Sequence, residues 1–149
     1  MKTIAIKNGD IQLAGGKIQF AVGSDKLVQD IRRWFQEPLG TGFTTPNFGS
    51  LLPAMIGGTQ TGSTVSSVTG EVQRLLQLYQ ANQVQQLQRA QNSAQLSNWN
   101  KSEIIQAINS VNVTIQNTTI LANISLLTMA NNNINLNISI NNTGVSVNG

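Results

Sequence analysis

The sequence predicts an α+β fold in which a small antiparallel β-sheet, a packed helix, a long central helix and C-terminal β-strands form one domain over residues 1–149. Two features of the hydrophobic pattern support this prediction. Near both ends of the chain apolar residues recur at every second position, which is typical of half-buried strands. Between these regions they recur at steps of three and four, which is typical of helices. The length is that of one ordinary domain.

The first element is a β meander, expected over residues 3–22. Ile4 and Ile6 alternate with small or polar residues, and Asn8-Gly9 is a strong signal for a two-residue hairpin turn. Two further alternating runs follow. Together they predict three short antiparallel strands.

A helix is expected next, over residues 24–36. Ser24 stands at the N-cap position, and Asp25 in the first turn complements the helix dipole. The helix should end by Glu37, because the residue before a proline is disfavoured in the α region. One apolar stripe follows the helical period, and its members are Leu27, Val28, Ile31, Trp34 and Phe35.

A loop rich in Gly, Thr and Pro follows over residues 38–63. It carries too many apolar residues for a free linker, so we expect it to pack against the domain or a partner. These residues are Phe43, Phe48, Leu51, Leu52, Met55 and Ile56.

The clearest helical period covers residues 64–96. A helix of this length extends about 45 Å at 1.5 Å per residue. It either supplies the core of its own domain and ends in a polar segment, or it reaches beyond the domain to join a bundle with neighbouring subunits. Its apolar seam consists of Val65, Val68, Val72, Leu75 and Tyr79.

The last third of the chain predicts a short helix and then strands. Asn100 and Glu103 fit a capping box, which indicates a helix over residues 101–109. Strands are expected over residues 111–147, with a turn at Asn131-Asn132-Asn133.

No charged residue follows Glu103. Exposed strand edges usually carry charges that prevent pairing with another chain. We therefore expect an edge that accepts a strand from another subunit; the alternative is a sheet that is merely kept soluble by its amide side chains. The apolar residues expected to fix the register of the exchanged strand are Ile120, Ile124, Leu126, Ile134, Leu136, Ile138 and Ile140.

The composition offers little catalytic or metal-binding chemistry. Without cysteine or histidine the chain lacks disulfides, thiolate ligands, the usual general base and the commonest metal ligand. The net charge of +3 comes from nine scattered basic residues, and the one adjacent pair, Arg32-Arg33, is expected on a solvated helix face. We expect no cofactor, no nucleic-acid partner and no membrane partner.

A glycoside hydrolase would require two carboxylates around a sugar-binding cleft. Asp10 suits a turn, and Asp25 suits a helix start. Glu71 is expected on the polar face of the long helix. No spacing forces a pair together, so the sequence predicts a protein that is not an enzyme. The six carboxylates are Asp10, Asp25, Asp30, Glu37, Glu71 and Glu103.

One stretch carries a more specific pattern: a helix, a turn with glycine, a Pro-x-Phe-Gly sequence and a short apolar run. The pieces are Leu27 to Phe35, Gly40, Pro46-Asn47-Phe48-Gly49 and Leu51-Leu52. This pattern resembles the baseplate wedge or sheath-initiator family of contractile phage tails, also labelled a lysozyme-like baseplate family.

The chain departs from this family at one motif. The family carries a Glu-Pro-Arg triplet before its C-terminal strands, where this chain has Ile108-Asn109-Ser110. Glu37-Pro38-Leu39 lies elsewhere and is not equivalent. The departure indicates a divergent branch and puts in doubt any wedge contact that depends on the triplet.

The resemblance implies a structural protein made in the host cytoplasm and located in the virion, in the tail baseplate. It implies six copies in a ring around the tube, contacts with wedge, sheath and tube or hub proteins, and sheath initiation by strand exchange with the first sheath ring. The long-helix seam would join a bundle of wedge proteins. The alternatives are a peripheral adhesin or receptor-binding subunit of a secreted particle, and a muramidase. A further interface would be the elbow, residues 46–52, through Pro46, Phe48, Gly49, Leu51 and Leu52.

Overall fold

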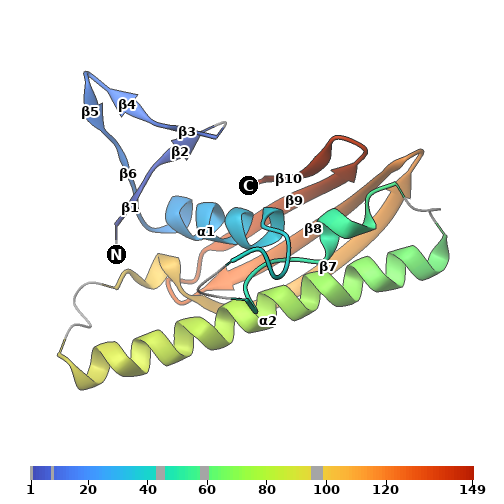
Figure 1. The fold of residues 1–149 in the computed structure, drawn as a ribbon. Helices are drawn as coiled ribbons and strands as arrows, with labels where there is room; N and C mark the ends of the chain where they lie inside the picture. The colour runs from blue at the N-terminus through green and yellow to red at the C-terminus, as the bar shows by residue number, and fades with distance from the viewer. Residues whose placement is uncertain (1, 8, 43–45, 58–60, 95–98) are drawn as a thin grey trace.

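The structure is a computed structural model that describes residues 2–7, 9–42, 46–57, 61–94 and 99–149. It combines helices with antiparallel sheets, so the predicted α+β class is confirmed. Figure 1 shows a C-terminal sheet with two helices packed on it and a small β module projecting from the N-terminal end of the chain. Within the described residues, no helix is both long enough and apolar enough to cross a bilayer.

The C-terminal sheet is antiparallel throughout, with the strand order β10-β9-β8-β7. Its two central strands alternate between buried apolar residues and more exposed Asn, Ser and other residues, because successive side chains point to opposite faces. The predicted turn at Asn131 is confirmed, with φ of 59° at that residue. The strands are β7 (Ile105–Gln116), β8 (Thr119–Thr128), β9 (Asn133–Asn141) and β10 (Gly144–Asn148).

Two α-helices share the inner face of this sheet: α1 (Ser24–Gln36) contacts β10, and α2 (Gly62–Asn92) contacts β7. The 3-10 helix η1 (Leu52–Met55) lies in the loop between them. The apolar stripes of the helices and the inner side chains of the strands form one core, to which every member of the predicted α1 stripe contributes.

The helix boundaries differ slightly from the predictions. Gly23, not Ser24, occupies the N-cap of α1. α2 begins two residues before the predicted position 64, because Thr61 and Thr64 form a reciprocal capping box there. α2 ends at Asn92, before the predicted position 96.

The predicted helix over residues 101–109 is wrong. A single 3-10 turn, η3 (Lys101–Glu103), precedes β7. The side chain of Asn100 does cap this turn by accepting a backbone hydrogen bond. The chain then becomes a strand because Gln83 of α2 binds its backbone: Gln83 Oε1 accepts from the N–H of Ile105 at 3.0 Å, and Gln83 Nε2 donates to the last carbonyl of the turn at 2.6 Å. Tertiary contacts outweigh the local helix signal here.

The predicted meander over residues 3–22 is not one sheet. Its six two-residue strands form three separate antiparallel ladders that meet at Ala5, Gln12 and Gln19. The backbones of these three residues close a ring of hydrogen bonds, each 2.8 or 2.9 Å long. We call residues 3–21 the three-arm module. Its ladders are β1 (Thr3–Ile4) with β6 (Phe20–Ala21), β2 (Ile6–Lys7) with β3 (Asp10–Ile11), and β4 (Leu13–Ala14) with β5 (Lys17–Ile18).

A seven-residue repeat underlies the three-arm module. The ring residues are seven positions apart, and so are Gly9, Gly16 and Gly23, whose φ angles are 84°, 74° and 62°. Glycine adopts this left-handed conformation without a steric penalty, so Gly9 and Gly16 turn the chain between paired strands and Gly23 turns it into α1. The alternation of apolar and polar residues does not reveal this repeat, but the seven-residue spacing of the glycines does. Asn8 of the predicted hairpin turn lies outside the described residues.

Candidate assembly surfaces

The elbow folds back onto the end of α1 and is held there by its backbone. Pro38 and Ser50 form a parallel β-bridge, and the N–H of Ser50 donates to the carbonyl of Glu37 at 2.8 Å. Gly49 lies against this bridge with φ of +111°. A Cβ at Gly49 would lie 2.7 Å from the carbonyl oxygens of both Glu37 and Pro38. The close approach and the backbone conformation both require glycine.

A buried carboxylate on α2 holds the other side of the elbow. Glu71 Oε1 accepts a hydrogen bond from the N–H of Leu51 at 2.8 Å. Arg74 donates to both oxygens of Glu71 at 2.7 Å, and these bonds raise the pKa of Arg74 above its ordinary value. Glu71 is only 5% exposed, so its predicted place on the polar face of the helix is wrong. It flanks the buried stripe and reaches the loop from there.

The apolar residues of the elbow divide between the core and the surface. Leu52 is completely buried and belongs to the main core, which confirms that the loop packs against its own domain. Leu51 is 43% exposed, and Pro46 is also exposed. Phe43 lies outside the described residues.

Phe48 joins the elbow to both helices through aromatic contacts. Its ring lies edge-on to that of Trp34, with 4.8 Å between centroids, and Trp34 lies edge-on to Tyr79 at 5.6 Å. The guanidinium carbon of Arg33 is 5.6 Å from the Phe48 centroid. Burial, together with the nearby Asp30 carboxylate, raises the pKa of the Tyr79 hydroxyl. The cluster is therefore a neutral aromatic seam with one cation at its rim.

Replacing Phe48 by alanine should lower the free energy of unfolding by about 1–2 kcal/mol, because the lost ring is half-buried and its edge-on contact adds only a modest term. A fully buried phenylalanine would cost ~3–5 kcal/mol. Urea unfolding followed by tryptophan fluorescence measures this difference. Phe48→Leu is the control, since it keeps apolar bulk while removing the ring. A loss as large as that of a core phenylalanine would contradict the half-buried placement.

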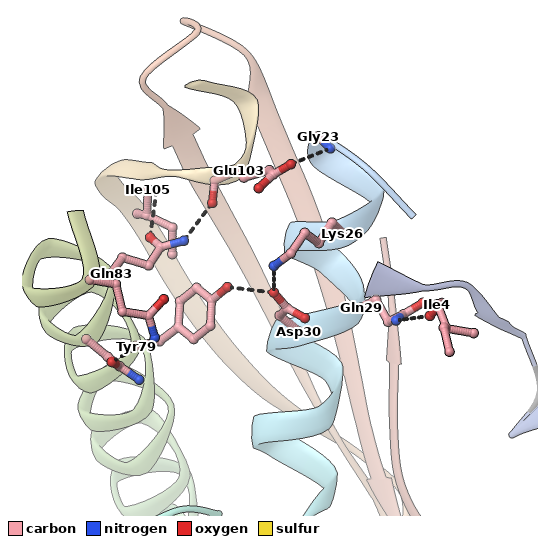
Figure 2. Close-up of polar contacts among 11 residues, drawn as sticks. Ile4, Gly23, Lys26, Gln29, Asp30, Tyr79, Gln83, Glu103 and Ile105 are labelled. Atoms are coloured by element: carbon pink, nitrogen blue, oxygen red, sulfur yellow. Dashed lines mark hydrogen bonds and ion pairs between the residues drawn. The ribbon is translucent and has the colours of Figure 1, made fainter. Parts of the chain in front are cut away.

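Two of the carboxylates, Asp30 and Glu103, make contacts that link elements of the fold. Asp30 and Glu103 line a cleft of about 220 Å³, below the ~300–1,000 Å³ of typical ligand pockets. Asp30 accepts a hydrogen bond from Tyr79 at 3.3 Å and pairs with Lys26 (Figure 2). Glu103 is buried and accepts from the N–H of Gly23 at 3.1 Å (Figure 2). Both carboxylates thus support the fold. Among the described residues, no three or more acidic side chains gather where they could hold a metal ion.

The seam of the long helix packs inside the domain, which corrects the expectation of an intersubunit bundle through these residues. α2 runs along β7, and this contact directs the seam into the core of its own chain. Val65, at the start of the seam, is half-buried. The other members all belong to the core, namely Val68, Val72, Leu75 and Tyr79.

The residues expected to exchange strands lie in the middle of the sheet, so that expectation is wrong. β8 and β9 are the central strands, and each is paired on both sides. Their backbones are therefore unable to receive another strand. The seven side chains point into the core and are at most 8% exposed: Ile120, Ile124, Leu126, Ile134, Leu136, Ile138 and Ile140.

The edges of the sheet are β10 and β7, and α1 closes the first of them. Arg32 Nε donates to the carbonyl of Val147 at 2.8 Å, and Gln36 Nε2 donates to the carbonyl of Val145 at 2.9 Å. These two carbonyls point away from β9. Arg32 is half-buried by this contact rather than placed on a fully solvated face. Helix side chains thus occupy the backbone groups through which β10 would pair.

β7 is the open edge. α2 runs beside this strand and binds its backbone at the start: Gln83 contacts Ile105, and Gln80 Nε2 donates to the carbonyls of Ile105 and Gln106 at 3.3 and 3.2 Å. The hydrogen bonds described from α2 side chains to the backbone of β7 go to Ile105 and Gln106. Residues 107–116 are therefore the part of this edge that we consider open to a further strand.

The register of β7 shows which backbone groups face outward. Gln116 and Thr119 pair across the two-residue turn to β8, and such closing pairs are hydrogen-bonded in tight hairpins. Because hydrogen-bonded and non-hydrogen-bonded pairs alternate, Val111, Val113 and Ile115 direct both N–H and C=O away from β8. The same rule applied to β10 gives Val145 and Val147, the residues that α1 binds.

The outer face of the sheet is uncharged and mostly polar, with Leu121 and Leu127 of β8 as apolar members. One row of asparagines crosses all four strands: Asn112, Asn123, Asn137 and Asn148. No aromatic residue follows Trp99 in the sequence, so this face has no ring on which a sugar could stack.

Comparisons of the chain with protein-family models, with curated proteins and with solved structures found no match. The surfaces described above are therefore the basis for a functional proposal.

Proposed function

We propose that this chain is a structural component of a contractile phage tail baseplate, and that it initiates the sheath by accepting a sheath strand at the open edge of β7. The pattern from the first helix to the elbow suggests the class of particle. The open edge at residues 107–116 carries the proposal, because it offers a site for strand addition. Six copies in a ring around the tube, held by wedge and tube or hub proteins, would present six such edges.

The residues of β7 are more typical of an edge that pairs with another strand than of an edge that stays exposed to solvent. Natural edges are usually protected by Lys, by Pro or by a covering element; β7 contains neither Lys nor Pro, and α2 binds its backbone at Ile105 and Gln106. The side chains of Val111, Val113 and Ile115 are only half-buried. An added strand would pair with their backbone groups and extend the cover over their side chains. We infer a partner segment that is extended, free of proline and apolar at alternate positions.

The proposal assigns no catalytic activity to the chain. The three carboxylates with the clearest structural tasks are Glu71 at the elbow, Asp30 between the helices and Glu103 at η3. Asp30 does share a cleft of about 820 Å³ with Glu37, but Asp30 is paired with Lys26 and the Glu37 carboxylate accepts a hydrogen bond from the Thr41 hydroxyl. This arrangement favours an assembly protein over the muramidase alternative.

Replacing Val113 by proline should abolish sheath attachment while the baseplate still forms. The substitution removes an outward N–H, which the ladder with β8 does not use, so the sheet itself should persist. The measurement is electron microscopy of particles in which the variant chain has been shown to be incorporated. We expect sheathed baseplates to fall about tenfold or more, the effect of ~1.4 kcal/mol on an equilibrium. Full-length sheaths on incorporated variant chains would contradict the proposal.

A matched pair of lysine substitutions tests which of the two edge strands, β7 or β10, accepts the added strand. Thr114 and Ser146 lie in the same row on the outer face, one on β7 and the other on β10. Thr114→Lys should reduce sheath attachment by placing a charge at the open edge. Ser146→Lys should leave attachment unchanged because α1 already closes that edge. Equal effects at both positions would argue against β7 as the acceptor.

A further inference from the structure

The three-arm module has an apolar face that no other part of the described chain covers. In each repeat, the residues on either side of the ring residue point to the same face, because side chains alternate along a strand. Cross-strand pairing joins these residues into three apolar pairs, one for each arm. Their side chains are between 40% and 61% exposed, and they are Ile4, Ile6, Ile11, Leu13, Ile18 and Phe20.

The charges of the module belong to its opposite face. Lys7, Asp10 and Lys17 alternate with the apolar set, as do the ring residues Gln12 and Gln19. The apolar face is therefore free of charge. An anionic membrane is a poor match for this arrangement, since both lysines would point away from the lipid headgroups.

The module is joined to the rest of the domain by few contacts. Gln29 of α1 accepts a hydrogen bond from the N–H of Ile6 at 2.9 Å. It also donates to the carbonyl of Ile4 at 2.8 Å (Figure 2). The side chain thus acts like a short pairing strand. Figure 1 shows the three arms projecting away from the C-terminal sheet. Another molecule can approach the module without displacing the helices or the sheet.

We propose that two copies of the chain pack the apolar faces of their three-arm modules against each other. The three arms repeat one pattern around the hydrogen-bonded ring, so the face matches a second copy of itself in shape and polarity. Six half-exposed side chains offer on the order of 500 Å², which is the size of the largest, often functional, apolar patch of a typical monomer (~300–600 Å²). Two such faces bury roughly 1,000 Å², which reaches the size of a specific interface of modest affinity.

A second copy fits this face better than a charged partner surface does. Charges placed against it would lose their hydration without gaining a counter-charge. A copy brings only apolar side chains to the contact. The isologous arrangement also closes after two copies, so it forms a dimer rather than an open chain.

Sedimentation of the full-length chain tests the proposal. Between about 1 µM and about 200 µM, the range in which an interface of this size associates, we expect a change from monomer to dimer. Leu13→Lys should weaken the dimer by about 100-fold, because it buries a charge at the contact. Gln12→Lys is the matched control: it places the same charge on the adjacent residue of the opposite face and should leave the dimer unchanged.

Cysteine crosslinking locates the contact, since the natural chain has no cysteine. A bismaleimide should join two copies of Leu13→Cys efficiently and two copies of Gln12→Cys poorly. Val113→Pro should dimerise normally, which distinguishes this proposal from that for β7. A chain that remains monomeric over the whole range would overturn the proposal. So would a dimer insensitive to Leu13→Lys, or apolar-face binding to anionic vesicles in place of dimerisation.

Discussion

Gly49→Ala is expected to lower the free energy of unfolding by about 3 kcal/mol or more, through two effects that act together. The added Cβ would lie 2.7 Å from the carbonyl oxygens of Glu37 and Pro38, and these backbone atoms are held by the bridge to Ser50. In addition, φ of +111° is a conformation that residues other than glycine rarely adopt. The bridge must open to accept the methyl group, so the elbow should detach from α1.

The control for this prediction is Gly40→Ala. Gly40 also has a positive φ, at +83°, but a Cβ there would meet no atom within 4 Å. Gly40→Ala should therefore lower the free energy of unfolding only by the cost of the left-handed backbone conformation, about 1 kcal/mol. Urea unfolding of both variants measures the difference. Equal losses at the two positions would show that the close contact of Gly49 with the bridge contributes nothing to stability.

The helices could be predicted from the sequence because their signal is local and repeated. The stripe from Leu27 to Phe35 has one face with a period of 3.6, and packing in the core requires that face. The seam from Val68 to Tyr79 is equally clear. The surface against which this seam packs could not be predicted, because the same apolar stripe is suited both to a domain core and to a bundle of subunits. Only the position of β7 beneath α2 decides between them.

The edges of the sheet illustrate a different limit on sequence reasoning. Alternation marks a strand but does not say which neighbours the strand has, so it predicts equally well an edge or a central position for segments 120–126 and 134–140, which are central. Turn length contains the missing information. Two-residue turns such as Asn117-Thr118 join neighbours in sequence, which makes the first and last strands of the series the edges. The closure of β10 by Arg32 depends on tertiary packing and left no local signal.

The burial of Glu71 could not be predicted from the sequence for a related reason. A carboxylate beside an apolar stripe normally points to solvent, and only the return of the elbow to α2 buries it. The sequence separation of 20 residues between Leu51 and Glu71 hides this contact. The signal that was present is the Glu71-Arg74 spacing, which allows an ion pair on one helix.

Glu71→Gln is therefore expected to lower the free energy of unfolding by about 2 kcal/mol, because it weakens the acceptor for the N–H of Leu51 and removes the charged partner of Arg74, whose side chain is 37% exposed. Adding Arg74→Met should recover part of this loss, since the double variant no longer holds an unpaired charge. Urea unfolding of the four proteins in a double-mutant cycle gives the coupling energy directly.

Glu37→Gln is the matched control for Glu71→Gln. The Glu37 carboxylate accepts a hydrogen bond from the Thr41 hydroxyl at 3.0 Å in an exposed setting, so the loss of its charge should leave stability unchanged. The distinction between the two positions is burial, because Glu71 is almost inaccessible to water and its partners are fixed by α2 and the elbow. If Glu71→Gln proved as mild as Glu37→Gln, the backbone bridge, the buried Leu52 and the Phe48 contacts would be enough to hold the elbow, and the ion pair would be incidental.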